Sequence, residues 1–203
     1  NDVAYAVLVQ PDNKIVAVGQ TTVFDPVYTA NIGLVRVNAD GSPDTGFGTN
    51  GRVSFDAGGS SIEEARGVVR RSSDGRLVVA GTTDRNGEYD IIFAAFTSDG
   101  QPDTTFGTDG VTIASFGPGS YEQAYALAQQ SDGALVAAGF GPGSSVQTMA
   151  AVRVTAAGEL DTTFDGDGLM IVDFGQVNAA ATSLAIQSNG RIVLAGYADV
   201  GGE

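Results

Sequence analysis

Acidic side chains recur at fixed places in this sequence and are its first candidates for chemistry. Three related eight-residue segments each open with an aspartate. In the third segment, Asp161, Asp165 and Asp167 resemble a short calcium-binding loop, because Ca²⁺ prefers several oxygen ligands. The alternative is structural, since a leading aspartate can cap its own turn by accepting backbone N–H groups. Repetition in every segment favours the turn. The calcium candidates are Asp103, Asp109, Asp161, Asp165 and Asp167.

Paired carboxylates also hydrolyse glycosidic bonds, and a carbohydrate-active or carbohydrate-binding propeller is the alternative function class. The chain has 24 Asp and Glu residues, so close pairs arise by chance, and the sequence singles out none. An enzyme would need one copy of the repeat to carry residues that the other copies lack. The copy-specific loops at residues 21–31 and 141–147 hold no carboxylate pair. We therefore expect a non-enzymatic protein without catalytic residues.

Two glycine-rich segments and three tyrosines are weaker candidates for ligand binding. The segments at residues 116–120 and 140–145 lack the lysine and the following helix of a phosphate-binding loop, so we interpret them as ordinary loops. Tyr28, Tyr89 and Tyr121 fall between predicted strands. They could stack on sugars there, but we expect them to pack at the rim of the fold.

The composition excludes several classes of function. The 203 residues include no cysteine and no histidine, which removes zinc–thiolate sites, disulfides and histidine-dependent triads. The net charge of −14 repels phosphate backbones, so we expect no nucleic-acid partner. No apolar run approaches the roughly 18–20 residues that cross a bilayer as a helix, so we expect no membrane insertion.

The eight-residue segments mark an internal repeat. Their phenylalanines, Phe47, Phe106 and Phe164, are separated by 59 and 58 residues. The sequence of each unit predicts four short strands joined by turns. Several of these turns contain Asp-Gly, which is a strong hairpin signal. The second strand closes on a glycine in every copy, and extra residues of the first copy fall in a loop at 21–31. The expected strands are 3–10, 14–20, 32–38 and 52–56; 64–71, 76–81, 90–96 and 111–116; 123–130, 134–140, 149–155 and 169–174; 181–187 and 191–197.

Four antiparallel strands in a repeat of this length are typical of one β-propeller blade. The first strand carries small residues that suit a crowded innermost position. The second is apolar on both faces, as expected between neighbouring blades. The fourth is the shortest and most polar, which suits an outer edge. We therefore predict an all-β fold, a β-propeller region over residues 1–203 with about 3.5 four-stranded antiparallel blades. The expected blades are 3–56, 62–116, 121–174 and an incomplete one at 179–203.

The motif residues also resemble a known family. The segment at residues 160–164 (Leu-Asp-Thr-Thr-Phe), the Gln-Ser-Asp-Gly turn at 130–133 and the Val-Ala-Gly strand end at 79–81 are similar to the delta-sixty repeat. That is a bacterial β-propeller repeat of unknown function. The resemblance covers essentially the whole chain. It implies a secreted or cell-surface bacterial protein and transfers no catalytic residues. The chain departs from the pattern at Gly46 and Asp165.

These features together predict a non-enzymatic extracellular or cell-surface module. It would act as a structural scaffold or as an adhesive, protein-binding surface, and self-assembly is one version of this hypothesis. The expected partners are other subunits or further repeats of a longer chain, because 3.5 blades do not close a ring of about six to eight. A strand at residues 192–194 would otherwise be an open edge. Glycans are the alternative partner. We expect no cofactor, with calcium as the alternative.

The repeated phenylalanine has a structural interpretation. We expect Phe47, Phe106 and Phe164 to be buried plugs between neighbouring sheets. The loops that deliver them would be held by the aspartates that open each segment, Asp44, Asp103 and Asp161.

Overall fold

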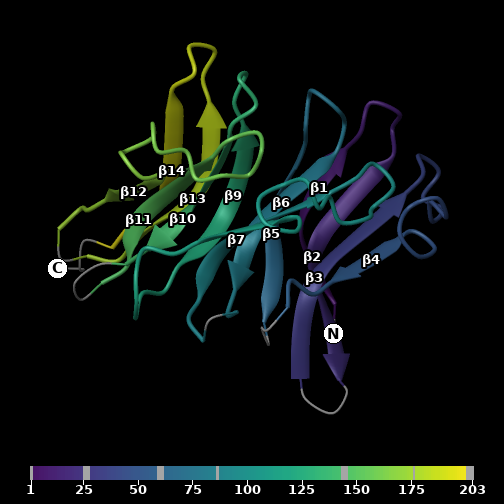
Figure 1. The fold of residues 1–203 in the computed structure, drawn as a ribbon, viewed down its shortest axis with the longest axis horizontal. Helices are drawn as coiled ribbons and strands as arrows, with labels where there is room; N and C mark the ends of the chain where they lie inside the picture. The colour runs from purple at the N-terminus through teal and green to yellow at the C-terminus, as the bar shows by residue number, and fades with distance from the viewer. Residues whose placement is uncertain are drawn as a thin grey trace.

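The computed structural model describes residues 2–24, 28–58, 62–85, 87–142, 146–175 and 177–199. These residues form fourteen β-strands and no helix, which confirms the predicted all-β class, and none of them forms a helix that could span a membrane. The strands build three four-stranded antiparallel blades and a two-stranded half-blade (Figure 1). Blade 1 contains β1 (Val3–Val9), β2 (Ile15–Phe24), β3 (Tyr28–Val37) and β4 (Arg52–Phe55); blade 2 contains β5 (Glu63–Arg70), β6 (Leu77–Thr83), β7 (Asp90–Phe96) and β8 (Val111–Ala114); blade 3 contains β9 (Gln123–Gln129), β10 (Leu135–Gly141), β11 (Thr148–Val154) and β12 (Leu169–Val172); the half-blade contains β13 (Ala179–Ile186) and β14 (Ile192–Ala198).

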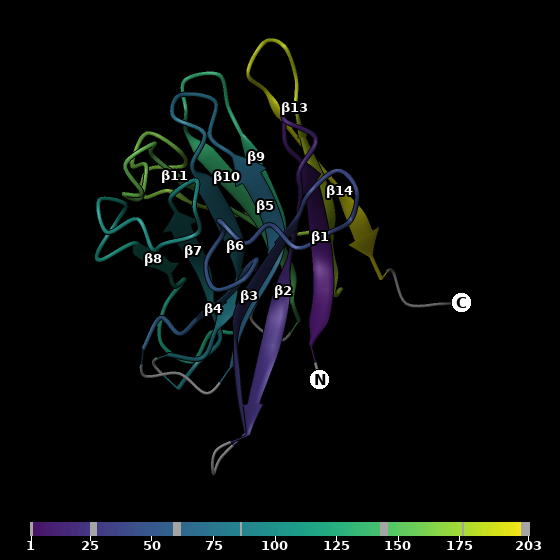
Figure 2. The same cartoon turned by 90° about the vertical axis from the view of Figure 1, so that its right-hand side faces the viewer.

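The blades follow one another around a common inner side. Within each blade the strands lie in chain order, and the first strands β1, β5, β9 and β13 contact one another in succession. Figure 2 shows β1 and β13 on one side of the array and the outer strand β8 on the opposite side. This is the strand arrangement of a β-propeller, in which the first strand of every blade lies nearest the axis.

The hydrophobic core lies between the blades. Every residue of β6, β7 and β10 is buried, because side chains alternate between the two faces of a strand and both faces are covered. In β6, Leu77 and Val79 pack toward blade 1, whereas Val78 and Ala80 pack toward blade 3. A third cluster joins blade 3 to the half-blade. The apolar runs of the middle strands are therefore required by blade stacking.

The two ends of the array are covered on one face only. On blade 1, Val7 and Val9 are 65% and 63% exposed, and Val35 is 42% exposed. At the other end, Val193 and Tyr197 of β14 are 44% and 49% exposed. We call these surfaces the blade 1 face and the half-blade face.

The observed strand bounds differ from the predicted ones mainly in blade 1. The prediction of a loop at residues 21–31 is wrong, because β2 and β3 continue through it as a paired hairpin as far as Phe24 and Tyr28. The physical reason is the β-branched content of this segment, in which Thr21, Thr22 and Thr29 favour a pleated backbone. The fourth strands, β4, β8 and β12, have four residues each and are the shortest strands described, as expected.

Candidate functional site

Each innermost strand contains a β-bulge, which places one extra residue outside the ladder. The pairing register with the second strand shifts between Ala4 and Ala6 in blade 1, and the same irregularity occurs in the other three units. A bulge leaves its extra residue unpaired and re-aims the side chain. The four extra residues are Tyr5, Arg66, Tyr125 and Thr182.

A glycine on the second strand makes room for each bulge. A Cβ atom on Gly81 would lie 1.8 Å from the carbonyl oxygen of Glu64, and one on Gly139 would lie 1.8 Å from that of Gln123. Gly19 and Gly196 have equally close backbone neighbours. The recurring glycine is therefore explained by the bulge opposite it. Contrary to the prediction, the second strands do not end on this glycine but continue at least two residues beyond it.

The bulge residues converge on a hollow at the inner side of the array. Tyr5, Arg66, Tyr125 and Thr182 line it together with Tyr197 of β14, and its volume is about 450 Å³. We call these five residues the axial cluster. The Arg66 guanidinium lies 4.3 Å from the ring centroid of Tyr5 and 5.2 Å from that of Tyr125. Such distances allow cation–π attraction from two rings at once.

The charge of Arg66 is balanced within the cluster. Its Nε donates to Glu64 Oε1 at 2.6 Å and its Nη2 to Oε2 at 3.4 Å. Burial acts to lower the pKa of Arg66, but the hydrogen bond and the charge of Glu64 outweigh it and raise the pKa. Burial raises the pKa of Tyr125, whose hydroxyl donates to Gln123 Oε1 at 3.2 Å. The cluster thus presents aromatic rings and hydroxyl groups around a compensated cation.

Sequence reasoning missed the axial cluster, although a signal for it exists. The bulge residue is flanked by small residues in each copy, for example Ala4 and Ala6 or Ala124 and Ala126. The small residues were correctly assigned to an innermost strand. The side chain between them was not singled out, because a one-residue bulge is visible only in the pairing with the next strand.

The repeated aspartates hold their own loops. Asp44, Asp103 and Asp161 each accept the backbone N–H of the residue two positions later, at 3.2, 3.2 and 3.0 Å. This is the turn-capping geometry described for the structural alternative. The loop of each unit is therefore closed by its first residue.

A basic side chain completes each of these turns. Asp44 pairs with Arg36 at 2.7 Å and with Lys14 at 2.9 Å, and the Lys14 hydrogen bond, followed by that of Arg36, lowers its pKa to about 2. Asp161 pairs with Arg153 at 2.8 Å, from the same strand position as Arg36.

Blade 2 has Ala95 at that position, and its aspartate Asp103 pairs instead with Arg76 at 2.5 Å. Burial acts to raise the pKa of Asp103, but the hydrogen bonds from Thr105 and Arg76 outweigh it and the pKa is lowered. The ion pair is thus retained in each blade, although the basic residue changes its place.

The calcium candidates lie in the loops between the third and fourth strands of blades 2 and 3. Asp109 and Asp165 are exposed and adopt left-handed backbone conformations, with φ of 53° and 51°. Asp167 Oδ1 accepts the backbone N–H of Leu169 at 2.9 Å. Within the described part of the chain, no three Asp or Glu residues are grouped so as to hold a metal ion. Calcium binding at Asp161, Asp165 and Asp167 stays a prediction.

The plug phenylalanines link neighbouring blades. Phe47 and Phe106 are 0% and 1% exposed, as predicted, whereas Phe164 is only partly buried. Beside each buried ring a backbone bond crosses to the next blade: Gly48 N donates to Asp99 O and Gly107 N to Ala157 O, both at 2.8 Å. We call this combination of ring and backbone bond the blade latch.

A carboxylate pair that sequence reasoning did not find lies between blades 2 and 3. Asp90 and Glu122 are 1% and 0% exposed. Burial, followed by the charge of Asp90, raises the pKa of Glu122 to about 7. The position of Asp90 is taken by Asn31 in blade 1 and Thr148 in blade 3, so the pair is specific to this junction. The two acids belong to different copies, which hid their proximity.

Tyr89, Tyr121 and the described residues of the two glycine-rich loops lie near this junction. The ring centroids of Tyr89 and Tyr121 are 4.5 Å apart. The ring of Tyr121 also stacks on that of Phe140, with 5.7 Å between the centroids. These contacts agree with rim packing, although Tyr121 remains 43% exposed. The side chain of Tyr28 and residues 143–145 of the second glycine-rich loop lie outside the described residues.

Comparison with protein families gives a repeated match. The model of a family described as "Domain of unknown function (DUF5122) beta-propeller" matches residues 10–47, 72–106 and 130–164, which is more than half of the chain. Each match starts after an innermost strand and ends on a plug phenylalanine. A search of curated protein sequences finds no match.

A search of solved structures finds two partial likenesses. A protein of unknown function from Dyadobacter fermentans has 13% identity and a TM-score of 0.55, over 93% of this chain and 54% of that one. MPT-4, a mannose phosphorylase from Leishmania mexicana solved with phosphate ion, has 13% identity and a TM-score of 0.45, over 91% of this chain and 60% of that one. The chain thus spans little more than half the length of these proteins, and the first likeness concerns the fold alone.

Proposed function

Because the chain belongs to the DUF5122 β-propeller family, whose function is unknown, we propose that it is a non-enzymatic scaffold that binds further propeller strands. These strands would come from other subunits or further repeats and would extend the blade array. The resemblance of its motifs to delta-sixty repeats supports a place outside the cell or on a bacterial cell surface.

The edge of β14 is the observation that carries this proposal. The equivalent strands β2, β6 and β10 each pair with a neighbour on both sides. Among the described strands, β14 pairs with β13 alone. A sheet edge is a template for another strand, and strand addition is a common mode of protein recognition. With two added strands, the half-blade would have four strands, like the three blades before it.

The half-blade face and the last plug support the same partner. Val193 is half-exposed on β14, where an added blade would cover it. Phe164 is only partly buried, and among the described residues no glycine turn packs against it as in the two complete latches. A strand pair that ends in such a turn would bury this ring.

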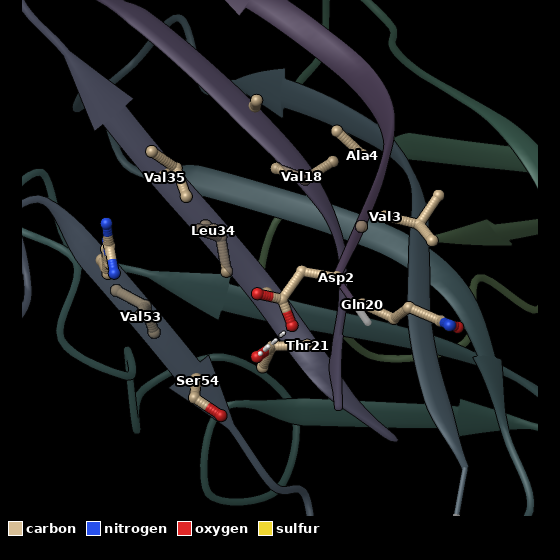
Figure 3. A pocket seen from close by; sticks show the side chains of 14 residues that line it. Asp2, Val3, Ala4, Val18, Gln20, Thr21, Leu34, Val35, Val53 and Ser54 are labelled. Carbon is tan, nitrogen blue, oxygen red and sulfur yellow. Dashed lines mark hydrogen bonds between the residues drawn. The ribbon is translucent and has the colours of Figure 1, made fainter. Parts of the chain in front are cut away.

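The opposite end of the array offers a second surface. The blade 1 face has a hollow of about 500 Å³, lined in part by Val3, Gly33, Val35 and Ser54 (Figure 3). At its margin, the Thr21 hydroxyl donates to Asp2 at 3.0 Å. Gly33 of blade 1 occupies the strand position that Ile92 occupies in blade 2. Because Gly33 has no side chain, the hollow stays open.

The placement of the acidic residues supports a non-enzymatic role. The aspartates that open the plug loops are engaged by arginines in all three blades. The copy-specific pair, Asp90 and Glu122, is 1% and 0% exposed, so a polymeric substrate does not reach it. A glycoside hydrolase needs its two carboxyl groups on either side of an accessible bond.

Strand addition can be tested with a synthetic peptide of residues 148–172, which holds the third strand, plug loop and fourth strand of blade 3. We expect the full chain to bind it in a 1:1 complex in analytical ultracentrifugation, and a scrambled peptide to stay free. Val193→Lys should weaken binding about tenfold, since a charge on an edge strand opposes pairing. Val7→Lys, at the opposite end, is the matched control. If the chain stays monomeric and binds neither the blade 3 peptide nor the scrambled one, the proposal is contradicted.

A further inference from the structure

We propose that the axial cluster binds a neutral saccharide of one or two sugar units. The site consists of Tyr5, Arg66, Tyr125, Thr182 and Tyr197 around a hollow of about 450 Å³. This volume lies within the range of about 300–1,000 Å³ that is usual for small-molecule sites. The proposal goes beyond scaffolding and does not depend on the edge of β14, although Tyr197 belongs to that strand.

The differences between copies point to a ligand. The bulge and its opposing glycine are the same in every unit, as a structural requirement should be. The bulge residue itself changes from tyrosine to arginine, tyrosine and threonine along the chain. No blade-packing requirement demands this variation, because the residue lies outside the ladder. Variation at a geometrically fixed position is what a ligand-specific surface needs.

The aromatic rings supply apolar faces for a sugar ring. Tyr5 and Tyr197 are 39% and 49% exposed, so their surfaces are available at the hollow. A tyrosine combines a flat apolar body with a polar hydroxyl tip. A pyranose has the matching character, with C–H groups on its faces and hydroxyls around its rim.

The polar groups are placed for hydroxyl recognition. Glu64 occupies the Nε and Nη2 edge of Arg66, which leaves the Nη1 edge to donate to a ligand oxygen. The Thr182 hydroxyl donates to Ala195 O at 3.4 Å, and its oxygen remains able to accept a hydrogen bond. A few oriented polar groups among aromatic walls are typical of small-molecule sites.

The electrostatics favour a neutral ligand over an anionic one. The positive charge of Arg66 is already paired with Glu64 at 2.6 Å. The whole chain carries a net charge of −14, which repels anions approaching the site. A uronic acid would therefore bind more weakly than its neutral counterpart.

The site is also held rigid before a ligand arrives. Two tyrosine rings lie on Arg66, and Glu64, which orients it, is only 7% exposed. The bulges are fixed by backbone contacts that leave no room for a side chain on the opposite strand. A preorganised site loses less conformational entropy on binding.

The experiment titrates the full chain with cellobiose and lactose as neutral probes. The chain has no tryptophan and six tyrosines, so tyrosine fluorescence and NMR of ¹³C-labelled tyrosine rings report on the site directly. We expect saturable changes with at least one probe, and weaker binding of glucuronate. Tyr197→Ala should raise the Kd about tenfold, and Thr182→Val a few-fold. Tyr121→Ala is the matched control, since Tyr121 is similarly exposed at 43% but lies outside the axial cluster.

Each other outcome overturns the proposal. No saturable response to either disaccharide would exclude the neutral saccharide class. Binding that survives Tyr197→Ala but is lost in Tyr121→Ala would place the site at the glycine-rich loops instead. Tighter binding of glucuronate, or of a proline-rich decapeptide, would assign the cluster to an anion or to a peptide. Circular dichroism of each variant separates loss of binding from loss of fold, and the peptide complex at β14 is scored independently.

Discussion

Phe106 and Gly158 face each other across the junction of blade 3 with blade 2. A Cβ atom on Gly158 would lie 2.8 Å from two ring carbons of Phe106, and Phe47 has the same relationship to Gly100, also with 2.8 Å as the shortest distance. The ring of one blade thus occupies the space left by a missing side chain in the next. At Gly41, in the corresponding turn of blade 1, no heavy atom lies within 4 Å of that position.

Gly158→Ala should therefore destabilise the protein more than Gly41→Ala. The two glycines have φ of 87° and 83°, so both alanines carry a similar left-handed strain of about 1–2 kcal/mol. Only Gly158→Ala also displaces a buried ring, which should add about 1–3 kcal/mol. Urea unfolding of both variants measures the difference. Equal losses would mean that the latch contributes little to stability.

Phe106→Ala should cost more than Asp103→Asn. Removing a ring that is 1% exposed leaves a cavity, and such truncations typically cost about 3–5 kcal/mol. Asp103→Asn keeps the shape of the turn and removes the charge that pairs with Arg76, which should cost about 1–2 kcal/mol. Equilibrium unfolding gives both values.

The same pair of variants tests calcium. The turn interpretation expects the unfolding free energy of the wild type, Phe106→Ala and Asp103→Asn to be unchanged by calcium or by a chelator. If the two substitutions behaved alike and calcium shifted the stability of the wild type, the loop would be a metal site. Asp109→Asn, in the same loop, would then lose the calcium response as well.

Gly139→Ala should disrupt the third blade. Its Cβ would lie 1.8 Å from a backbone oxygen of β9, so the strands must separate or the bulge must be lost, at a cost of more than about 3 kcal/mol. Gly46→Ala is the control, because its nearest neighbour is a side-chain oxygen at 3.5 Å. That substitution should change stability by less than about 1 kcal/mol. A mild effect of Gly139→Ala would show that the blade tolerates a regular ladder.

The stability of the protein should fall as the pH rises from about 4.5 to about 7. Glu122 has a pKa of 4.5 when exposed and of about 7 in the folded protein, so the folded state binds its proton more tightly than the unfolded state over this interval. The linked loss is roughly 3 kcal/mol. Glu122→Gln, which is neutral throughout, should remove this slope, whereas Glu159→Gln on the surface should keep it. Unfolding at several pH values compares them.

How far the sequence predicts the fold depends on the range of the interactions. The strands and turns follow from local alternation and from Asp-Gly pairs, and the plug role of Phe47 follows from repetition. The continuation of β2 to Phe24 was missed, because length variation suggested a loop where β-branched residues extend the ladder. The axial cluster and the Asp90–Glu122 pair each join residues of different copies, and no local pattern records which copies touch.

Because of the bulge, different residues of the same strand maintain the fold and form the inner surface. The small flanking residues and the opposing glycine preserve the scaffold, whereas the residue between them is free of ladder pairing. Each repeat contributes one such side chain to the inner side, and a substitution there leaves the ladder pairing of the strand unchanged. The inner side of this array is thus a modular surface, in which the bulge side chain of each blade can change separately.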